Sequence, residues 1–386
     1  MVAQSFQVPV NCLSGRTPIK DQCEMTAIIA IMTAQSFLSP RIMLHRPTRP
    51  SAAPTLKDLA RLAGVSPITA SRALHRPELV AEATRARVAQ AVEQSGYVPN
   101  SLAGGLTSRQ TRLVAAIVPS MGHSLFSDML DALITSLAAE RYETTLGISR
   151  YDPAHEETWL AAMLSRRPEG VVLTGTEHTA RARRLLLNAD IPVVELWDYT
   201  PHPLDVIIGF SQEDAGRAAF RHLAACGYQR PAILRSDDSR AHRRAQGFLR
   251  AAAETGAPEP VQIVFPEDSP QAGRGRDAFS ALRAQAPQAD AVFCSSDALA
   301  QGVLAQAHAL GLQVPRQMGV LGFGDQALAV DCIPALSSVK VDGAYIGRLG
   351  AAALIARMRG DNVTAAQDVG FEVIARASTR AAAGRP

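Results

Sequence analysis

The stretch TLKDLARLAGVSPITASRALH, residues 55–75, predicts two short helices joined by a tight turn. The apolar residues of its first half share one helical face: Leu56, Leu59, Ala60 and Ala63. This helix should end at Gly64, because glycine readily adopts the left-handed conformation that terminates helices. Ser66 would cap the second helix, with Pro67 at its first position.

This spacing is that of a helix-turn-helix, a motif that places its second helix in the major groove of DNA. Ala60 is small enough for the two helices to cross closely, and Val65 and Ala70 would fill the space between them. A third helix over about residues 83–95 would complete a DNA-binding domain over residues 54–100. An ordinary helical hairpin is the alternative. The groove-facing surface of the second helix would carry Ser66, Pro67, Ile68, Thr69 and Arg72.

The net charge of +3 is distributed unevenly along the chain. Residues 51–112 contain eight Lys or Arg against four Asp or Glu, and residues 1–50 contain five against two. The remaining 26 basic and 30 acidic residues make segment 113–386 mildly acidic. A basic head on an acidic body indicates that only the head binds a polyanion such as DNA. The alternative is that the charge is distributed unevenly by chance.

Residues 1–53 show no sustained hydrophobic period, and we expect a disordered extension or sequence upstream of a start at Met43. The longest apolar run, Met25–Ala34, is half of the roughly 20 residues that a membrane span needs. The clean basic start of a signal peptide is also missing. We therefore expect no membrane partner and a cytoplasmic location.

Cysteine usage and motif content exclude several function classes. The five cysteines are scattered and include no CxxC pair, which excludes a disulfide scaffold and a thiolate zinc site. P-loop, GxSxG and HExxH motifs are absent from the sequence. GFGDQA, residues 322–327, is only a fragment of a dinucleotide fingerprint and follows a late strand. We predict a protein that is not an enzyme and that uses no metal or cofactor.

After Arg112 the pattern changes to short apolar strands that alternate with helices. This alternation predicts the α/β class, with parallel sheets arranged as two similar lobes over residues 112–380 and a ligand cleft between them. The predicted strands are LVAAIVPS (113–120), TTLGIS (144–149), GVVLTG (170–175), PVVEL (192–196), DVIIGF (205–210), PAILRS (231–236), QIVFP (262–266), AVFCSS (291–296) and MGVLGFG (318–324). The predicted helices lie near residues 124–140, 155–165, 179–189, 212–226, 240–255, 271–285 and 298–310.

Polar residues at the carboxyl ends of these strands are the candidate ligand contacts, because open α/β sheets bind ligands there. Each one alone could be an ordinary surface-loop residue, but they recur at successive strand ends. The candidates are Ser120 with His123 and Phe126, Thr176 with His178, Trp197 with Asp198, Arg244, Ser296 with Asp297, and Gly324 with Asp325 and Gln326.

From Thr55 to Leu106 the sequence resembles the head of the lactose-repressor (LacI) family, and the body extends the resemblance over residues 54–380. The matching motifs are TLKDLARLAGVSPITASRALHRPELV and GYVPNSLAGGL. The resemblance implies an all-α helix-turn-helix head on a two-lobed body similar to type I periplasmic binding proteins. It also implies a homodimer on double-stranded operator DNA, with a hinge over residues 101–111.

The resemblance assigns DNA contacts residue by residue. Within the hinge, Ala103 would be a DNA contact and Leu106 would insert between base pairs of the minor groove as an apolar wedge. The recognition surface would consist of Ser66, Pro67, Ile68, Ser71 and Arg72. The other contacts would be Thr55 and Lys57 near phosphates, Leu56 at the start of the first helix, and Tyr97 and Asn100 on the DNA backbone.

For the body, the resemblance implies a small-molecule effector between the lobes. Arg244 falls on the arginine that grips the ligand, Ser296–Asp297 on a pair that binds hydroxyls, and Ser120 on a first-loop contact. The aspartate that is common after GF in the family is replaced by Gly324, with Asp325 one step later. Loss of this acid favours a carboxylate-bearing effector, held by Arg244.

Several phrases resemble the gluconate-utilisation repressors of the family: RPELV, GVVLTGTEHT, IPVVELWD, DVIIGF and DAVFCSSDALA. They imply that gluconate, or a relative such as 2-ketogluconate, releases a repressor from its operator. The alternatives are a regulator of another sugar, a corepressor-dependent regulator, a transport-type sugar-binding protein and a Rossmann-type enzyme. The terminal ARASTRAAAGRP lacks the leucine heptads of a tetramerisation segment, which favours a dimer.

Overall fold

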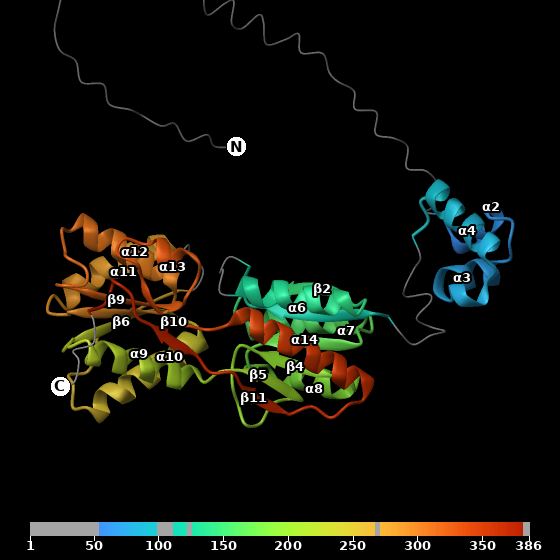
Figure 1. Cartoon of the computed structure of the whole chain (residues 1–386). Coiled ribbons are helices and arrows are strands. Elements are labelled where there is room, and N and C mark those ends of the chain that lie inside the picture. Colours follow the sequence, from blue (N-terminus) through green and yellow to red (C-terminus); the bar gives the residue numbers. More distant parts are fainter. Residues whose placement is uncertain (1–53, 99–110, 122–125, 267–270, 381–386) are drawn as a thin grey trace, which may run out of the picture. The chain divides into compact units, whose positions relative to one another are not determined.

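The computed structural model describes residues 54–98, 111–121, 126–266 and 271–380. The chain divides into two compact units, residues 1–99 and 100–386, which we call the head and the body (Figure 1). Within the described ranges, no helix is both long enough and apolar enough to cross a membrane. The predictions for residues 1–53, Ala103 and Leu106 lie outside these ranges.

Residues 54–98, the described part of the head, form three α-helices and one short 3-10 helix. Its elements are α2 (Leu56–Leu62), α3 (Pro67–His75), η2 (Pro77–Leu79) and α4 (Glu82–Ser95). The three α-helices contact one another around a small apolar core formed by Leu59, Ala63, Val88 and Ala91. Ala60 and Ala70 are also buried, as the close crossing of α2 and α3 requires. The predicted helix-turn-helix fold is confirmed.

Local hydrogen bonds fix where the head helices begin. Thr55 and Asp58 form a capping box at α2, in which the Asp58 N–H donates to the Thr55 hydroxyl at 3.3 Å. The Ser66 hydroxyl accepts the Thr69 N–H at 3.1 Å, which confirms the predicted cap of α3. Gly64 forms the turn between the helices with a φ of 63°, a conformation that glycine adopts without a steric penalty.

The body folds into two α/β lobes, each built on a six-stranded sheet. Lobe 1 has the strand order β11-β5-β4-β3-β1-β2, and all neighbouring strands are parallel. Its strands are β1 (Leu113–Val118), β2 (Glu143–Ile148), β3 (Gly170–Thr174), β4 (Val193–Leu196), β5 (Val206–Gly209) and β11 (Ala366–Asp368). Its helices are α6 (Ser127–Ala139), α7 (Pro153–Leu164), α8 (Ala180–Ala189) and α14 (Gly343–Arg359).

Lobe 2 has the strand order β12-β10-β9-β8-β6-β7. Its pairs are parallel except for β12, which is antiparallel to β10 at the edge of the sheet. The strands are β6 (Pro231–Ser236), β7 (Gln262–Phe265), β8 (Ala291–Cys294), β9 (Gly319–Gly324), β10 (Ser337–Lys340) and β12 (Glu372–Ile374). The helices are α9 (Gln212–Ala225), α10 (Ser239–Glu254), α11 (Gln271–Gln285), α12 (Asp297–Ala309) and α13 (Leu328–Asp331).

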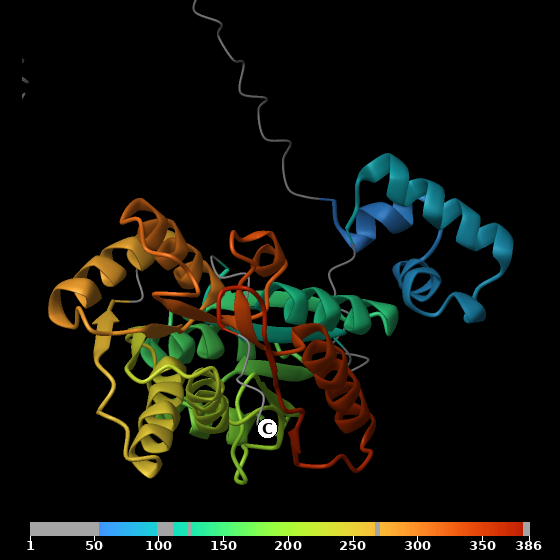
Figure 2. The ribbon, with the colours of Figure 1, turned by 60° about the vertical axis from the view of Figure 1, so that its left-hand side comes forward.

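Helices cover both faces of each sheet (Figure 2). In β1, Val114 and Ala116 face the α6–α14 layer, whereas Ala115 and Ile117 face the α7–α8 layer. This alternation follows from the two-residue period of a strand, and it explains why the strands read as continuous apolar runs. In lobe 2 the two layers are α9–α10 and α11–α12.

The chain passes between the lobes three times: after β5, between β10 and α14, and between β11 and β12. Phe210, Val341 and Phe371 lie at these three crossings. All three belong to, or pack against, one hydrophobic cluster that continues from lobe 1 into lobe 2. Three segments of the chain therefore connect the lobes, and an apolar residue of each segment belongs to or packs against this shared cluster, which we call the junction.

The nine predicted strands are all present, with bounds that differ by no more than two residues from the prediction. No helix or strand was predicted beyond residue 324, whereas the described chain continues with α13, β10, α14, β11 and β12. Because these elements alternate between the lobes, neither lobe is a single continuous segment. The antiparallel β12 is likewise an addition to the predicted parallel sheets.

Candidate DNA-binding surface and ligand cleft

The first turns of α3 present polar and apolar groups to solvent. The exposed residues are Ser66, Pro67, Ile68 and Arg72, and the half-buried ones are Thr69 and Ser71. Ile68 is 66% exposed. The hydroxyls of Ser66 and Thr69 lie 2.9 Å apart and bond to each other, whereas no carboxylate among the described residues pairs with Arg72. Arg72 suits the acceptor pair of guanine and Ile68 suits a thymine methyl group.

The remaining predicted DNA contacts of the head are distributed over two other segments. Thr55 and Lys57 are exposed at the start of α2, where positive charge can meet phosphates. Leu56 and Tyr97 are partly buried and pack against the head core. Asn100 lies outside the described residues.

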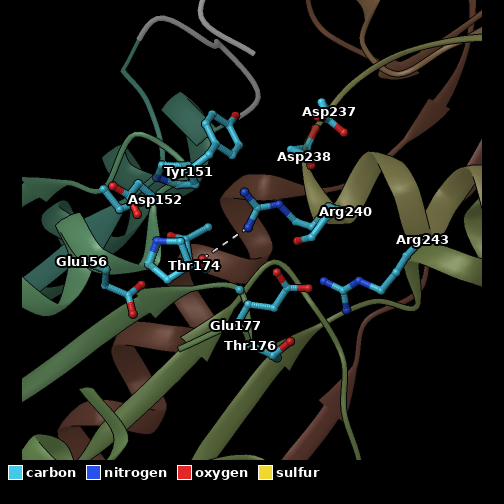
Figure 3. Close-up of a pocket in the computed structure, with 15 residues that line it drawn as sticks. Tyr151, Asp152, Glu156, Thr174, Thr176, Glu177, Asp237, Asp238, Arg240 and Arg243 are labelled. Carbon is cyan, nitrogen blue, oxygen red and sulfur yellow. Dashed lines mark hydrogen bonds between the residues drawn. The ribbon is translucent and has the colours of Figure 1, made fainter. Parts of the chain in front are cut away.

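A cavity lies between the lobes at the carboxyl ends of β2, β3 and β6 (Figure 3). Lobe 1 supplies residues at or after the ends of β1, β2 and β3, and lobe 2 supplies the segment after β6 and the first turns of α10. The charged residues of the lining are Asp152, Glu156, Glu177, Asp237, Asp238, Arg240 and Arg243. This position agrees with the general rule that ligands bind at strand carboxyl ends.

Arg240 projects from the first turn of α10 toward lobe 1 (Figure 3). Its Nη1 donates to the carbonyl oxygen of Thr174 at 3.3 Å. Its guanidinium lies 5.5 Å from the ring centroids of both Phe126 and Tyr151, and the residue is 8% exposed. In the described part of the chain, no carboxylate forms an ion pair with it. Arg240 therefore brings into the cleft a positive charge whose hydrogen-bond partner is a neutral carbonyl.

Arg243, one turn further along α10, also reaches lobe 1. Its two terminal nitrogens donate to the two carboxylate oxygens of Asp198, with Nη1 and Oδ1 3.0 Å apart. Burial raises the pKa of Asp198, and the charge of Arg243 opposes that rise. Removing one partner of such a buried pair leaves an uncompensated charge. This ion pair therefore links the lobes.

Arg244, the predicted ligand arginine, is not part of the cavity lining. Its Nη1 donates to Gln212 Oε1 at 2.5 Å and its Nη2 to the Ser295 carbonyl oxygen at 3.3 Å. Its guanidinium lies 3.9 Å from the ring centroid of Phe323, and burial lowers its pKa to about 10. Gln212 in turn donates to the carbonyl oxygen of Trp197 at 2.9 Å. The side chain of Gln212 thus links Arg244 to the backbone of lobe 1.

His178 is held between two carboxylates. Its Nδ1 lies 2.5 Å from Glu156 Oε1 and its Nε2 lies 3.3 Å from Glu195 Oε1, with the imidazole fully buried. Burial alone would lower the pKa of His178, but the two glutamates outweigh it and raise this pKa to about 9. The imidazole is therefore charged at neutral pH, and it holds Glu156, which lines the cavity.

Asp297 and Asp325 take part in a hydrogen-bonded network within lobe 2. The Asp297 carboxylate accepts from the Ser338 hydroxyl at 2.6 Å and from the Gln326 N–H at 2.7 Å. Burial raises the pKa of Asp297 to about 6. Asp325 forms an ion pair with Arg376 at 2.5 Å. In the described ranges, no group of His, Cys, Asp and Glu side chains could hold a metal ion.

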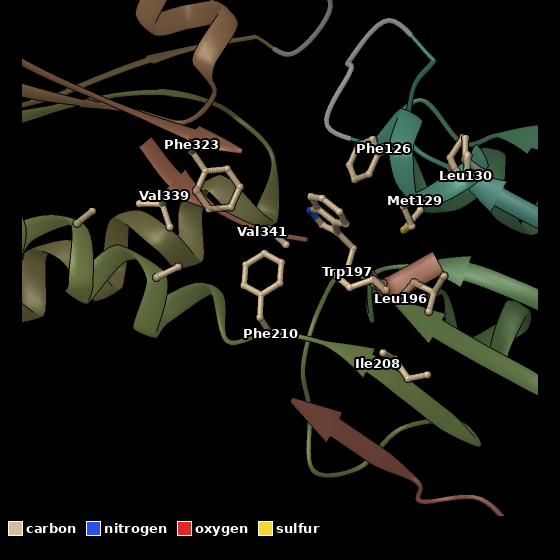
Figure 4. Close-up of a cluster of buried hydrophobic side chains, with 14 of the residues drawn as sticks. Phe126, Met129, Leu130, Leu196, Trp197, Ile208, Phe210, Phe323, Val339 and Val341 are labelled. Carbon is tan, nitrogen blue, oxygen red and sulfur yellow. The ribbon is translucent and has the colours of Figure 1, made fainter. Parts of the chain in front are cut away.

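Phe126 and Trp197 belong to an aromatic cluster at the junction of the lobes (Figure 4). Trp197 packs edge-on against Phe126 and Phe210, with ring centroids 5.2 and 5.9 Å apart. Phe210 continues the cluster to Phe323 of lobe 2 at 6.1 Å. Since Phe126 also faces the guanidinium of Arg240, this cluster forms an apolar boundary next to the charged cavity.

Several predicted ligand residues contact the cavity lining without belonging to it. These contacts are His178 with Glu156, Asp198 with Arg243, and Phe126 with Arg240. Thr176 lies in the lining itself, and Ser120 directly follows the lining residue Pro119. Ser296 caps α12 by accepting the N–H of Leu299. His123 lies outside the described residues.

Four residues of the cavity lining were not predicted from the sequence: Arg240, Arg243, Tyr151 and Glu156. Tyr151, Arg240 and Arg243 could have been predicted from the sequence. RYDP follows the strand at 143–148, and DDSRAHR follows the strand at 231–236. The same rule of strand carboxyl ends, applied to these two strands, points to both segments.

A helix-turn-helix head with an exposed recognition helix, in one chain with a two-lobed body that contains a charged cleft, defines a class of protein. This class is the DNA-binding regulator whose body carries a ligand site.

Comparison with known proteins identifies the family. Residues 55–100 match bacterial regulatory proteins of the lacI family, and residues 220–379 match a periplasmic binding protein-like domain. A transcriptional regulator named GntR from Pseudomonas aeruginosa is 40% identical over 335 residues, which is 86% of this chain and 97% of that protein. A LacI-family regulator from Silicibacter pomeroyi has a TM-score of 0.80 and 31% identity, over 85% of this chain and 100% of that one. The lac repressor dimer bound to operator and an anti-inducer has a TM-score of 0.74 and 23% identity, over 86% of this chain and 100% of that one.

The chain belongs to the LacI family of bacterial transcriptional regulators. It is a DNA-binding regulator and not an enzyme, because its family and its relatives are regulators. The family and the α/β fold class predicted from the sequence are confirmed.

Proposed function

We propose that the protein is a dimeric repressor that leaves its operator when a sugar acid, such as gluconate or 2-ketogluconate, binds between the lobes. The observation that carries this proposal is that guanidinium groups and carboxylates line one cavity between the lobes. A sugar acid combines one carboxylate with several hydroxyls, so it requires a cation and hydrogen-bond acceptors together. The resemblance to gluconate-utilisation repressors supports the same ligand class.

On the DNA side, α3 would lie in the major groove, with Arg72 and Ile68 reading base edges. Both are exposed in the head. The related fold of the lac repressor, which is a dimer on its operator, supports this arrangement. The remaining proposed contacts are Ser66, Pro67, Thr69 and Ser71 on the recognition helix, Thr55, Leu56, Lys57, Tyr97 and Asn100 at or near the DNA backbone, and Ala103 and Leu106 in the minor groove.

The effector would act by binding two arrangements of the lobes with different affinity, because only such a difference can shift an equilibrium. The cavity is lined by both lobes, and Arg240 and Arg243 both contact lobe 1 from lobe 2. A ligand in this cavity would therefore touch the groups that connect the lobes. A changed lobe arrangement in each subunit would alter the spacing of the paired heads and weaken operator binding.

Fluorescence anisotropy on a labelled DNA fragment from upstream of the neighbouring genes tests the proposal. The full chain is titrated onto the fragment at fixed salt, since binding to DNA depends on salt. Gluconate, 2-ketogluconate, glucose and ribose are then added in turn. We expect release by a sugar acid and not by glucose.

The other outcomes separate the alternatives. Release by a neutral sugar alone would contradict the sugar-acid effector and keep the repressor. Tighter operator binding in the presence of a sugar acid would contradict the inducer role and indicate a corepressor. Operator binding that no sugar acid changes would contradict the proposed effector class.

A further inference from the structure

On the basis of the function proposed above, we infer that Arg240, rather than Arg244, binds the effector carboxylate, and that the site accepts only one carboxylate. The effector class is therefore a polyhydroxy monocarboxylate, an aldonic acid, and not the corresponding dicarboxylate. Arg240 lines the cavity and Arg244 does not.

The first three arginines of α10 differ in what their guanidinium groups already bind. Arg243 is neutralised by the two carboxylate oxygens of Asp198. Arg244 is enclosed by protein acceptors and an aromatic ring, and is 5% exposed. Arg240 donates to the neutral carbonyl of Thr174. A ligand carboxylate would replace this carbonyl readily, because charge-assisted hydrogen bonds are the stronger ones.

The surroundings of Arg240 hold its guanidinium in place before a ligand arrives. The rings of Phe126 and Tyr151 lie at equal distance from it and limit its motion. Gly175 permits its approach to lobe 1, because a Cβ at that position would lie 2.8 Å from Arg240 Nη1. A cation that is already positioned loses little conformational entropy on binding.

The acidic groups nearby set the limit of one carboxylate. Asp152, Glu156 and Glu177 line the lobe 1 side of the cavity, and the Glu156 carboxylate is fixed by His178. Carboxylate oxygens accept hydrogen bonds from ligand hydroxyls, whereas they repel a second carboxylate. Burial opposes ionisation of Asp238, but the charges of Arg244 and, next, Arg240 outweigh it and lower the pKa of Asp238. Its oxygens already accept from the Ser236 hydroxyl and the Ala241 N–H.

Isothermal titration calorimetry of the full chain with gluconate, glucarate and glucose tests this assignment. We expect Arg240→Gln to lower the gluconate affinity roughly 10- to 100-fold, as expected for the loss of a hydrogen bond to a charged group. Arg250→Gln is the matched control, because Arg250 lies on the same helix and pairs with Glu213 on the surface. The wild type should bind gluconate and should bind glucarate at least about tenfold more weakly.

Each of the other possible results contradicts one part of the inference or the proposed function on which it rests. Unchanged gluconate affinity in Arg240→Gln, together with lost affinity in Arg244→Gln, would overturn the assignment and leave the proposed function intact. Equal affinity for glucarate and gluconate would overturn the limit of one carboxylate. A wild type that binds no sugar acid would overturn the proposed function itself.

A second variant keeps the assignment testable if Arg240→Gln does not fold. Arg240→Lys keeps the charge but loses the planar fork, so we expect a smaller loss of gluconate affinity, roughly tenfold. Circular dichroism of each variant reports whether the fold is retained. A folded Arg240→Lys with wild-type affinity and wild-type preference for gluconate over glucose would contradict the paired hydrogen bond that we assign to Arg240.

Discussion

At the scale of single residues, His178 shows how position controls charge. An imidazole on a protein surface is mostly neutral at pH 7. Here Glu156 and Glu195 contact its two ring nitrogens and raise its pKa to about 9 despite complete burial. The protonated form is therefore the one that the folded state stabilises, and the unfolded chain has the ordinary pKa of about 6.5.

This difference predicts a stability that depends on pH. Because the folded pKa is the higher one, the contribution of His178 is fully present below about pH 6.5 and is lost as the pH rises through about 9. The contribution is on the order of 3 kcal/mol. Urea unfolding of the wild type and of His178→Asn at pH 6, 7.5 and 9 measures it. We expect the wild type to lose stability over this range and the variant to be much less sensitive. Equal pH dependence in both proteins would contradict a charged His178.

Arg72 supplies the residue-scale prediction for DNA. Its exposed guanidinium can pair with a guanine edge, so Arg72→Ala should weaken operator binding by roughly 1–3 kcal/mol and non-specific binding by less. Anisotropy with operator and with scrambled DNA at one salt concentration measures both. Arg85→Ala, an exposed arginine of α4, is the control. Equal losses on the two DNAs for Arg72→Ala would mean that Arg72 contacts only phosphate.

The sequence-based rule of strand carboxyl ends indicated some of the residues at the cavity, but not which of them line it. Asp198 and His178, both predicted as ligand contacts, lie next to the cavity lining, and each is bound to a residue of that lining. Which of three neighbouring arginines faces a cavity depends on the 100° step between helix positions and on where α10 begins. Single-sequence patterns fix neither the start nor the rotation of a helix closely enough.

At the scale of elements, α9 and α10 touch backbone to backbone. A Cβ on Gly247 would lie 1.9 Å from the Glu213 carbonyl oxygen, and one on Gly216 would lie 1.8 Å from the Arg244 carbonyl oxygen. Both glycines are therefore required by the close packing of the two helices. Because α10 carries Arg240 and Arg243, this packing also positions two residues of the cavity lining.

Gly247→Ala should consequently destabilise the body by roughly 1–3 kcal/mol, because the helices must separate. Gly273→Ala is the matched control, since nothing lies within 4 Å of the added Cβ on α11. That control should be neutral, or more stable by up to about 1 kcal/mol through helix propensity. Urea unfolding followed by circular dichroism compares the two. A Gly247→Ala variant as stable as the control would contradict the close contact.

A similar close packing of two helices explains why α14 was not predicted from the sequence. Its sequence GAYIGRLGAAALIARMR contains glycines at positions 343, 347 and 350, which favour a loop when propensity alone is considered. In the fold, a Cβ on Gly347 would lie 2.1 Å from the carbonyl oxygen of Met129. The glycines thus allow α14 to lie directly against α6, and that tertiary contact outweighs their low propensity. By contrast, the strands could be predicted because a strand that is buried on both faces appears in the sequence as a continuous apolar run.

At the scale of the whole molecule, the aromatic junction between the lobes contains one of only two tryptophans in the chain. Trp197 packs between Phe126 and Phe210 at this junction. Trp159 lies on α7 and packs against the hydrophobic cluster on that face of lobe 1. The indole of Trp197 is therefore placed to report on a change in lobe arrangement.

Trp159→Phe leaves Trp197 as the single tryptophan, and its emission should change when the effector binds. The change arises because relative movement of the lobes alters the packing of the indole against Phe126 and Phe210. Steady-state fluorescence during a gluconate titration measures it, and Trp197→Phe is the control that should show no change. An emission of Trp159→Phe that the effector leaves unchanged would contradict lobe movement at the junction.

The triple connection between the lobes has a consequence for how such a chain can diversify. One crossover in the gene near codon 100 exchanges the head, with its recognition helix α3, separately from the body. No single crossover exchanges one lobe, because β11 of lobe 1 and β10 and β12 of lobe 2 are interleaved in the last part of the chain. A recombinant that takes its carboxyl-terminal segment from a relative acquires pieces of both lobes at once. Chimeras designed to change inducer specificity should therefore transfer the body as one block.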